Sequence, residues 1–291
     1  MTICAGVVTY NADMRLLKKN LKVLMSQVSR IYIVDNGSEN VEDINSIING
    51  NNQLRLMHNE TNFGVAKALN QLCMMAMHDS FEWILTMDQD SICAPDMVKF
   101  LSAFIDNSAY GIIAPRVEFW DCNTLVLSTK SGDKETTEVP ACITSGSLTR
   151  LEAWEKVGGF DEWYFIDRVD NEFCTHLAVK GYKVLRVNKA ILYQRAGKMK
   201  YIQLPLVGKL LLPYYDEKRN YYICRNSVYF FRKYRHNIDV VHHVMVFVYS
   251  QILKLLFESR RWATLRSTFR GIKDGKKKII EYNNYLCRGN I

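Results

Sequence analysis

The sequence predicts an α/β fold built on an open parallel sheet with helices on both faces, followed by a helical extension. Short β-branched, apolar runs alternate with amphipathic segments along the N-terminal part of the chain. This alternation, in units of about 30 residues, is typical of consecutive strand–helix–strand units. Near Pro213 the composition shifts to interleaved tyrosines and arginines. We therefore expect two domains, residues 1–213 and 214–291.

Composition agrees with a soluble globular chain. Of the 291 residues, 48% are hydrophobic and 23% are charged, which is ordinary for a folded protein with a sizeable core. The eight cysteines occur singly, without a C-x-x-C pair or zinc-ligand spacing, and predict reduced packing residues of a cytosolic protein. A strand-like segment directly follows Met1, so no secretory signal is expected.

The predicted elements of the N-terminal half follow from periodicity, because strands are short apolar runs and helices repeat apolar residues every three to four positions. Strands are expected at residues 2–10, 30–34, 54–57, 83–87 and 111–117, and helices at residues 16–28, 41–48, 65–77 and 96–105. Residues 118–138 are polar and predict a surface excursion. Residues 139–151 are strand-like, a helix over 151–157 stops at Gly158-Gly159, and another helix runs from the neighbourhood of Asp170 to Gly181.

Polar side chains follow four consecutive predicted strands. They are Thr9 and Asn11, Asp35 and Asn36, Asn59 and Asn62, and Asp88 and Asp90. In open α/β sheets the ligand lies outside the carboxyl ends of the strands. The clustering favours a binding site at that edge over a set of turn-forming residues.

The segment Trp83-Ile84-Leu85-Thr86-Met87-Asp88-Gln89-Asp90 is the centre of this prediction. Side chains two apart on an extended backbone point to the same side, so Asp88 and Asp90 can converge. Mg²⁺ or Mn²⁺ would be a natural occupant, since both prefer oxygen ligands. The alternative is that both aspartates open a turn or cap the helix after Pro95.

A nucleotide would be held without the commonest phosphate motifs. Neither G-x-G-x-x-G nor G-x-x-x-x-G-K-[ST] occurs, which disfavours a classical dinucleotide enzyme or a P-loop ATPase. Asp35 can accept a hydrogen bond from a pyrimidine ring, and Gly64 allows close backbone approach where a helix begins. Lys67 either adds a cation there or belongs to a solvated helix face. Ser145 and Gly146 either admit a ligand or form a bulge.

A second acidic cluster lies in GGFDEWYFIDRVDNEF, where Asp161, Asp167, Asp170 and Glu172 occur among aromatic residues that include Trp163. The following helical pattern places Asp170 near a helix N-terminus. Two interpretations stay open: a helix cap, which the helix dipole favours, or a general base on a rigid element.

Taken in order, TYN, VDNGS, N-x-x-N-x-G-V-A, TMDQDS and GGFDEWYFIDRVDNE resemble the family 2 glycosyltransferases, with the closest similarity to the bacterial rhamnosyltransferase branch. The resemblance covers about residues 2–187. It implies a GT-A (nucleotide-diphospho-sugar transferase, Rossmann-like) fold, a nucleoside-diphosphate sugar donor, a Mg²⁺ or Mn²⁺ cofactor and inversion at the anomeric carbon.

The resemblance also implies roles for individual residues. Asp170 matches the catalytic base. Asp88 and Asp90 match the acidic pair that faces the ribose and the metal-bound diphosphate, and of the two Asp90 is favoured as the direct metal ligand. The nucleotide-sugar site is expected to contain Thr9, Asn11, Asp35, Asn36, Asn62, Gly64, Lys67 and Asp88. The donor or acceptor pocket is expected to contain Ser145, Gly146, Trp163, Asp167, Glu172 and Arg195.

Two positions depart from the family pattern. Val169 stands where many relatives have Glu, as it does in the rhamnosyltransferase branch. Many relatives also carry a histidine after the last strand of the domain, but here the segment reads ILYQRAGKMK. Gln194, Arg195 or Lys198 is expected to cover the diphosphate instead.

The tail segment KRNYYICRNSVYFFRKY resembles the tail helix of the same branch, and no nucleic-acid-binding motif accompanies it. Residues 240–257 are apolar but interrupted by polar side chains, and nine Lys/Arg against two Asp/Glu occur between Lys254 and Lys278. This pattern favours a helix lying on the anionic cytoplasmic face of the inner membrane. The alternative is a helical hairpin with a solvated basic face.

The expected activity is inverting transfer of L-rhamnose from dTDP-L-rhamnose to a polysaccharide or lipid-linked oligosaccharide of the O-antigen, capsule or cell-wall type. Alternatives are another donor (UDP-galactose, UDP-glucose or UDP-galactofuranose), a non-catalytic nucleotide-sugar-binding assembly subunit, and, more weakly, a nucleotidyltransferase. The last is disfavoured because an N-terminal Gly-rich basic phosphate loop is missing.

Overall fold

The fold is seen in a computed structural model that describes residues 2–121, 124–128, 134–197, 199–204, 208–213, 215–257 and 260–288. The chain forms two compact units. One comprises Met1–Phe165 and Val169–Ala196, and the other comprises Ile166–Arg168 and Gly197–Ile291. The division expected after residue 213 thus falls inside the second unit, because the segment from Gly197 groups with the tail.

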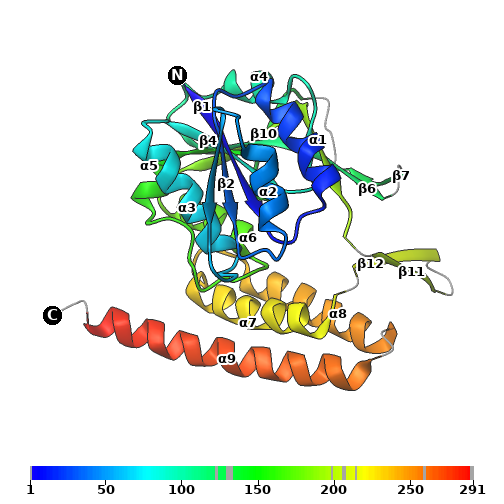
Figure 1. Cartoon of the computed structure of the whole chain (residues 1–291). Helices are drawn as coiled ribbons and strands as arrows, with labels where there is room; N and C mark the ends of the chain where they lie inside the picture. Colours follow the sequence, from blue (N-terminus) through cyan, green and yellow to red (C-terminus); the bar gives the residue numbers. More distant parts are fainter. Residues whose placement is uncertain are drawn as a thin grey trace. The chain divides into compact units, whose positions relative to one another are not determined.

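Apart from the short β5 after β4, the N-terminal unit alternates strands and helices as predicted up to β6; β7, β8 and β9 then follow one another (Figure 1). Its elements are β1 (Ile3–Thr9), α1 (Met14–Met25), β2 (Ile31–Asp35), α2 (Val41–Ile48), β3 (Leu54–His58), α3 (Val65–His78), β4 (Trp83–Asp88), β5 (Ile92–Cys93), α4 (Met97–Ser102), β6 (Tyr110–Asp121), β7 (Thr124–Ser128), β8 (Thr136–Val139), β9 (Ser147–Arg150), α5 (Leu151–Lys156), α6 (Val169–Val179) and β10 (Lys183–Arg195).

The sheet has the strand order β3-β2-β1-β4-β9-β6-β10-β5. Strands β3, β2, β1 and β4 are parallel, as are β6 and β10, but β9 runs antiparallel to both β4 and β6. The sheet is therefore mixed: the five strands expected in the first 117 residues share one direction, and the antiparallel β9 lies between two of them. Parallel neighbours need a long crossover, usually a helix, and the described residues between β6 and β9 include no helix. The chain consequently enters the sheet in the reverse direction.

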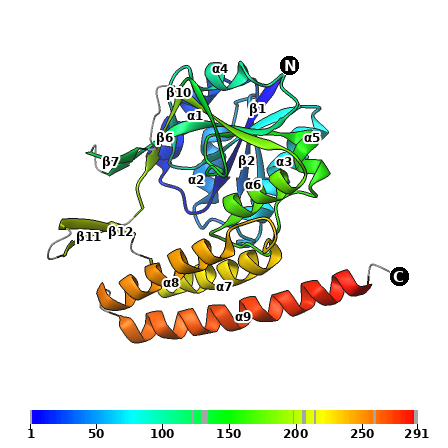
Figure 2. The ribbon, with the colours of Figure 1, turned by 180° about the vertical axis from the view of Figure 1, so that it is seen from behind.

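The region expected to be a surface excursion also contributes strands. β6 continues to Asp121 and β7 pairs with β6 (Figure 2), and β8 pairs with β10. Conversely, only Ser147–Arg150 of the strand-like segment 139–151 is a strand. Polarity predicted solvent exposure here but could not reveal pairing with strands distant in sequence.

Alternate side chains of the central strands point to opposite faces of the sheet and pack against the helices there. Ala5 and Val7 of β1 join Ile31 and Ile33 of β2 in a buried cluster that also contains Leu17, Leu21 and Leu24 of α1. On the opposite face a Cβ on Gly6 would lie 3.0 Å from the Leu72 side chain of α3, so the glycine allows that helix to approach the sheet. Helices α1 and α2 thus cover one face and α3 the other (Figures 1 and 2), as the apolar strands predicted.

The C-terminal unit contains the hairpin β11 (Met199–Leu204) and β12 (Gly208–Pro213), followed by α7 (Glu217–Lys233), α8 (Val240–Phe257) and α9 (Arg261–Arg288). The helical extension is confirmed, whereas no sequence pattern had indicated the hairpin. Helices α7 and α9 lie side by side (Figure 1). A Cβ on Gly271 would lie 2.5 Å from the Tyr221 carbonyl oxygen, and one on Gly275 equally close to the Arg225 carbonyl oxygen. Two glycines one turn apart therefore let the helix backbones touch.

Helix α8 presents apolar side chains to solvent and buries polar ones. Buried Lys254 donates to Asn220 Oδ1 (3.0 Å), and the Thr268 hydroxyl donates to Gln251 Oε1 (3.2 Å). The exposed apolar stripe of α8 consists of Val241, Val244, Met245, Val248, Tyr249, Ile252 and Leu256. Among the described residues α8 alone is long and apolar enough to cross a membrane, with mean hydropathy 1.6 and 17% of its residues buried. A water-soluble helix normally has the opposite arrangement.

Candidate functional site

Asp35, at the carboxyl end of β2, is a fully buried carboxylate surrounded by donors. Its Oδ1 accepts from the hydroxyls of Thr9 (3.0 Å) and Ser38 (2.5 Å), and its Oδ2 from the Ser38 amide (3.0 Å). His58 Nδ1 lies 2.9 Å from Oδ2. These contacts fix the ends of three adjacent strands. A pyrimidine ring can reach Asp35 only by replacing one of these partners, and partly exposed His58 is the replaceable one.

The Asp35 carboxylate should make the free energy of unfolding depend on pH. Burial raises the pKa of Asp35, but hydrogen bonds from Ser38, His58 and Thr9 outweigh it and the net pKa is lowered. A carboxyl whose pKa is lower in the folded state stabilises the fold above its unfolded pKa, and that stability is lost as pH falls through the folded pKa. We expect Asp35→Asn to be less stable at pH 7 and less sensitive to acid below about pH 4. Urea unfolding over a pH series measures both effects, and equal pH slopes for the two proteins would contradict the assignment.

Hydrogen bonds of the Asn36 side chain connect the loops that follow β2 and β3. The Asn36 side chain is buried; its amide donates to Asn62 Oδ1 and the Gly64 carbonyl, and its Oδ1 accepts from Asn59 (all 3.1 Å). Exposed Asn11, with φ of 47°, accepts from the Glu39 amide (2.9 Å). Most predicted nucleotide-binding side chains thus shape the strand-end loops through contacts with one another.

Gly64 contacts both Asn36 and the segment of the second acidic cluster. Its φ of 90° and ψ of 168° favour glycine, and a Cβ would lie 2.6 Å from the Phe165 carbonyl oxygen. The same oxygen accepts a hydrogen bond from the Val65 amide (2.7 Å). The absent side chain of Gly64 therefore lets the loop before Asp170 rest on the start of α3, so its role includes packing.

Replacing Gly64 by alanine should destabilise the N-terminal unit by about 2–3 kcal/mol, because backbone strain and the clash with Phe165 act together. Thermal unfolding would measure the loss. Gly50→Ala is the matched control, since Gly50 has a φ of 80° but no atom within 4 Å of the point that a Cβ would occupy. An equal loss in both variants would show that strain alone acts at Gly64.

The acidic pair at the end of β4 is held by residues distant in sequence. Gln194 of β10 donates from Nε2 to Asp88 Oδ2 (3.0 Å), and the Asp88 amide donates to the Ser145 hydroxyl (3.1 Å). Ser145 donates in turn to Ser91 (2.8 Å), whose hydroxyl donates to Gln194 Oε1. Gln194 thus closes a hydrogen-bonded ring around Asp88.

Asp90 is partly buried beside this ring. Burial raises the pKa of Asp90, and the positive charge of Arg195 lowers it in part. A carboxylate penalised by burial gains from a bound cation. In the described part of the chain no group of three or more His, Cys, Asp or Glu residues could hold a metal. Two carboxylates nevertheless fit Mg²⁺ or Mn²⁺ when phosphate oxygens and waters complete the shell.

Ser145 and Gly146 belong to the packed interior. Ser145 is buried in the ring around Asp88, and the Gly146 amide donates to the Thr86 carbonyl (2.7 Å). Gly146 has a φ of 79°, and a Cβ there would lie 2.9 Å from the Pro115 side chain. A side chain at position 146 would therefore clash with Pro115, and the glycine allows this close packing. The small residues serve close packing against β4, β6 and β10.

Asp170 is the second residue of α6, so it lies inside the first turn and is not the N-cap. Its Oδ1 accepts from the Asn171 amide (2.8 Å). Asp170 borders a small cavity of about 10 Å³ together with Thr86, Thr144 and Ser147. Segment 144–147 therefore touches both acidic regions: Ser145 binds Asp88, and its neighbours border the cavity of Asp170. The structure brings the two distant clusters to the same edge of the sheet.

The other predicted pocket residues occupy varied positions. Glu172 is buried in α6, Trp163 is partly buried, and Lys67 pairs with Glu162 (3.1 Å). Arg195 is exposed near Asp90. Asp167 belongs to the C-terminal unit and accepts from Arg219. Lys198 lies outside the described residues.

Sequence reasoning missed Asn70 of α3. Its amide donates to the Phe160 carbonyl (2.9 Å) and to Glu162 (3.1 Å), and its Oδ1 accepts from the Phe160 amide (2.9 Å) and from Trp154 (3.1 Å). Asn70 thus holds the start of the second acidic cluster against α3. A buried polar residue on the apolar face of a predicted helix was the available signal.

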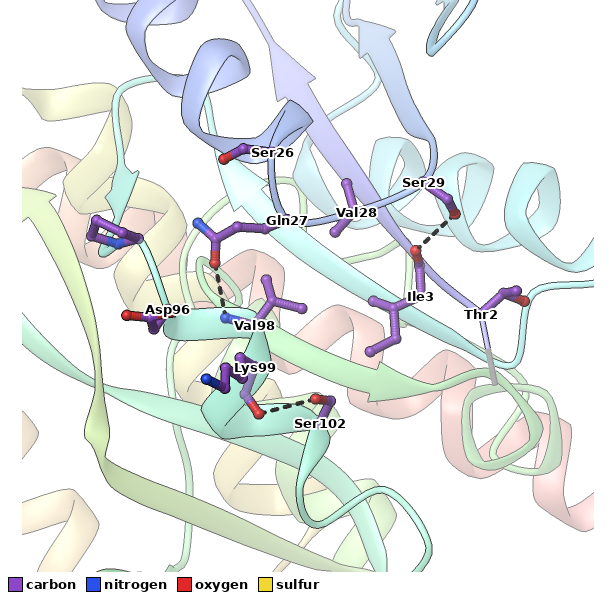
Figure 3. A pocket seen from close by; sticks show the side chains of 11 residues that line it. Thr2, Ile3, Ser26, Gln27, Val28, Ser29, Asp96, Val98, Lys99 and Ser102 are labelled. Carbon is purple, nitrogen blue, oxygen red and sulfur yellow. Dashed lines mark hydrogen bonds between the residues drawn. The ribbon is translucent and has the colours of Figure 1, made fainter.

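A separate cavity of about 540 Å³ lies at the opposite edge of the sheet, beside Thr2 and Ile3 at the start of β1 (Figure 3). Gln27 accepts from the Val98 amide (3.0 Å), and Ser29 donates to the Ile3 carbonyl (3.3 Å). Gln27 and Ser29 thus bind backbone groups of the cavity's own lining, at the amino ends of the strands. Ligands of open α/β sheets bind at the carboxyl ends, so this cavity is not the candidate site.

Known proteins resemble this chain in sequence and fold. The dTDP-rhamnosyl transferase RfbF of Shigella flexneri is 27% identical over 79% of this chain and 80% of its own length. The crystal structure of Staphylococcus aureus TarS 1–349 matches with a TM-score of 0.62 and 16% identity, over 94% of this chain and 81% of that one.

The crystal structure of GalNAc-T7 with UDP, GalNAc and Mn²⁺ matches with a TM-score of 0.56 and 15% identity, over 67% of this chain and 44% of that one. These likenesses confirm the expected GT-A fold. Residues 4–158, more than half of the chain, match the description Glycosyl transferase family 2. This protein is a family 2 glycosyltransferase.

Proposed function

We propose that this enzyme transfers L-rhamnose from dTDP-L-rhamnose, with inversion, to a hydroxyl of a polysaccharide or lipid-linked oligosaccharide. The observation that carries the choice of sugar is the similarity to a dTDP-rhamnosyl transferase along most of both chains. The acidic pair and Asp170 at one edge of the sheet supply the groups that such a transfer needs.

In this proposal Asp170 is the general base. Its carboxylate takes the proton of the acceptor hydroxyl while that oxygen forms a bond to the anomeric carbon. The bond from the anomeric carbon to the nucleoside diphosphate breaks on the opposite face, so the configuration inverts and no covalent enzyme intermediate forms. The position of Asp170 in the first turn of α6 holds its carboxylate on a rigid element.

Asp90, with Asp88, would hold Mg²⁺ or Mn²⁺ against the diphosphate of the donor. A bound divalent ion stabilises the negative charge that develops on the leaving diphosphate. Gln194 keeps one Asp88 oxygen oriented, and exposed Arg195 adds positive charge beside Asp90. Gln194 and Arg195, two of the residues expected to cover the diphosphate in place of a histidine, would thereby act beside the metal.

Incubation of the purified protein and Mg²⁺ with dTDP-rhamnose, UDP-galactose, UDP-glucose and UDP-galactofuranose, followed by mass spectrometry, tests the donor. We expect release of the nucleoside diphosphate from dTDP-rhamnose in clear preference to the UDP-sugars. Preference for a UDP-sugar would replace the donor, and binding without turnover of any donor would favour a non-catalytic assembly subunit.

We further propose that the exposed apolar stripe of α8 lies on the cytoplasmic face of the inner membrane. Trp262, at the start of α9, is 84% exposed, and Arg266, Arg270 and Lys273 of the same helix are also exposed. Apolar side chains beside exposed cations are typical of helices that lie in an anionic lipid interface. The burial of Lys254 and Gln251 favours this orientation over a span, since α8 keeps a polar face against α7 and α9.

A further inference from the structure

We propose that a groove of the helical unit binds the phosphate headgroup of a membrane lipid. The groove has a volume of about 500 Å³ and lies between α7, α8 and α9. Its apolar wall includes Phe231, Val240 and Ile279, and its cations are Arg232, Arg235 and Lys276. The inference rests on the proposed membrane contact and names the lipid chemistry that this surface recognises.

Charge and burial favour a phosphate-bearing amphiphile as the occupant. Among the described residues neither Arg232 nor Lys276 has a carboxylate within ion-pair distance, and both are exposed. Val244 and Ile280 belong both to the groove and to the exposed apolar surface of the unit. A lipid can therefore place its chain against the apolar wall while its phosphate meets the cations, which recognise phosphate through charge-assisted hydrogen bonds.

The test uses the full chain with dodecyl phosphate below its micelle concentration, followed by calorimetry. We expect one bound molecule per chain and no comparable binding of inorganic phosphate or of dodecyl maltoside. The double variant Arg232→Gln/Lys276→Gln should weaken binding roughly tenfold or more. The matched double variant Lys19→Gln/Lys22→Gln removes the same charge from exposed sites of α1 in the N-terminal unit and should keep the affinity for dodecyl phosphate.

Vesicles of phosphatidylglycerol with phosphatidylcholine, compared with phosphatidylcholine alone, connect the groove to a bilayer. The natural protein should sediment with the phosphatidylglycerol vesicles. Of the two double variants, the groove variant Arg232→Gln/Lys276→Gln should bind these vesicles more weakly. Equal binding by both double variants to dodecyl phosphate would overturn the inference. So would a dimer in solution that covers the groove. Vesicle binding by the groove variant through Val241 and Trp262 would leave the membrane contact itself standing, and donor turnover reports the transferase activity separately.

A second, independent observation concerns Ile166–Arg168, which belong to the helical unit although Asp170 follows them after one residue. The backbone φ is 65° at Asp167 and 64° at Arg168, in the left-handed region that non-glycine residues seldom adopt. Three side chains of α7 hold this strained segment. They are Arg219, Asn226 and Ser227.

The contacts are short and partly buried. Arg219 donates from Nε and Nη2 to the Asp167 carboxylate (3.1 and 3.0 Å). The buried Asn226 amide donates to the carbonyls of Ile166 and Asp167 (both 2.8 Å). Arg168 donates to the buried Ser227 hydroxyl (2.9 Å) and lies over the Phe231 ring at 5.0 Å. We infer that α7 positions the proposed base by fixing the strained segment that precedes it.

Arg219→Met should therefore lower kcat roughly 10- to 100-fold while the KM for the donor changes little, because small displacements of a reacting group are costly. Arg219→Lys, which keeps the charge, should recover part of the loss. The control is Arg270→Met, which removes a cation lying over the Tyr221 ring elsewhere in this unit. In an Asp170→Asn background Arg219→Met should cause no further loss. An unchanged kcat in Arg219→Met, or an additive loss in the double variant, would refute the positioning role.

Discussion

Asp170→Asn should reduce sugar transfer by about 10²–10⁴-fold, the range that a positioned general base contributes. The asparagine oxygen can still accept from the Asn171 amide, so the first turn of α6 stays intact. What is lost is the ability to take a proton from the acceptor hydroxyl. Steady-state kinetics with dTDP-rhamnose and an acceptor measure the loss, and calorimetry with the donor should show unchanged affinity.

Asp161→Asn is the control for this substitution. Asp161 lies in the same acidic segment, where its Oδ1 accepts from the Trp163 amide (3.1 Å), and asparagine preserves that acceptor. This variant should transfer sugar at nearly the normal rate. Retained turnover in Asp170→Asn would remove the base assignment, whereas a loss of donor affinity would indicate a structural or binding role for Asp170.

Asp90→Asn should weaken the metal-dependent part of donor binding by about 100-fold or more. Substitution of groups that only orient metal ligands already costs 10- to 100-fold, and Asp90 would be a direct ligand. Removing the carboxylate also relieves the burial penalty that raises the pKa of Asp90, so the variant should fold at least as stably. Calorimetric titration of the protein with the donor, once in the presence of Mn²⁺ and once in the presence of EDTA, gives the metal-dependent part of the donor affinity.

The same carboxyl predicts a pH dependence. Because the pKa of Asp90 is raised, protons should compete with the cation at higher pH than for an ordinary aspartate. Apparent metal affinity in the natural protein should thus fall as pH decreases through that raised pKa. Asp96→Asn is the control, since Asp96 is exposed and its side chain makes no capping hydrogen bond. Identical metal dependence in Asp90→Asn and the natural protein would exclude Asp90 as a ligand.

The N-terminal strands and helices could be predicted because their signals are local. The apolar run before Asp88 and the polar residues after four strands specify which residues reach the carboxyl edge of a sheet. The structure places Asp35 and Asn36 at the end of β2 as expected. It also shows that both side chains are engaged with protein partners, which no local pattern indicates.

Local patterns also could not reveal the direction of β9 or the packing around Gly146. β9 enters the sheet in reverse between β4 and β6, and its direction depends on how the chain connects it to β6 rather than on its own residues. The small size of Gly146 was compatible with a ligand or a bulge, and the structure shows close packing against Pro115 and Leu192 there. Both contacts join segments far apart along the chain.

By itself, the sequence determined the alternating strands and helices, the acidic residues at strand ends, the family and the basic helical tail. Periodicity, turn residues and ordered motifs are properties of neighbouring positions. Only the tertiary structure decided that Gln194 binds Asp88, that segment 144–147 adjoins both acidic regions, and that α8 exposes its apolar side. These features depend on contacts between residues distant in sequence, because packing determines which side of each element is buried.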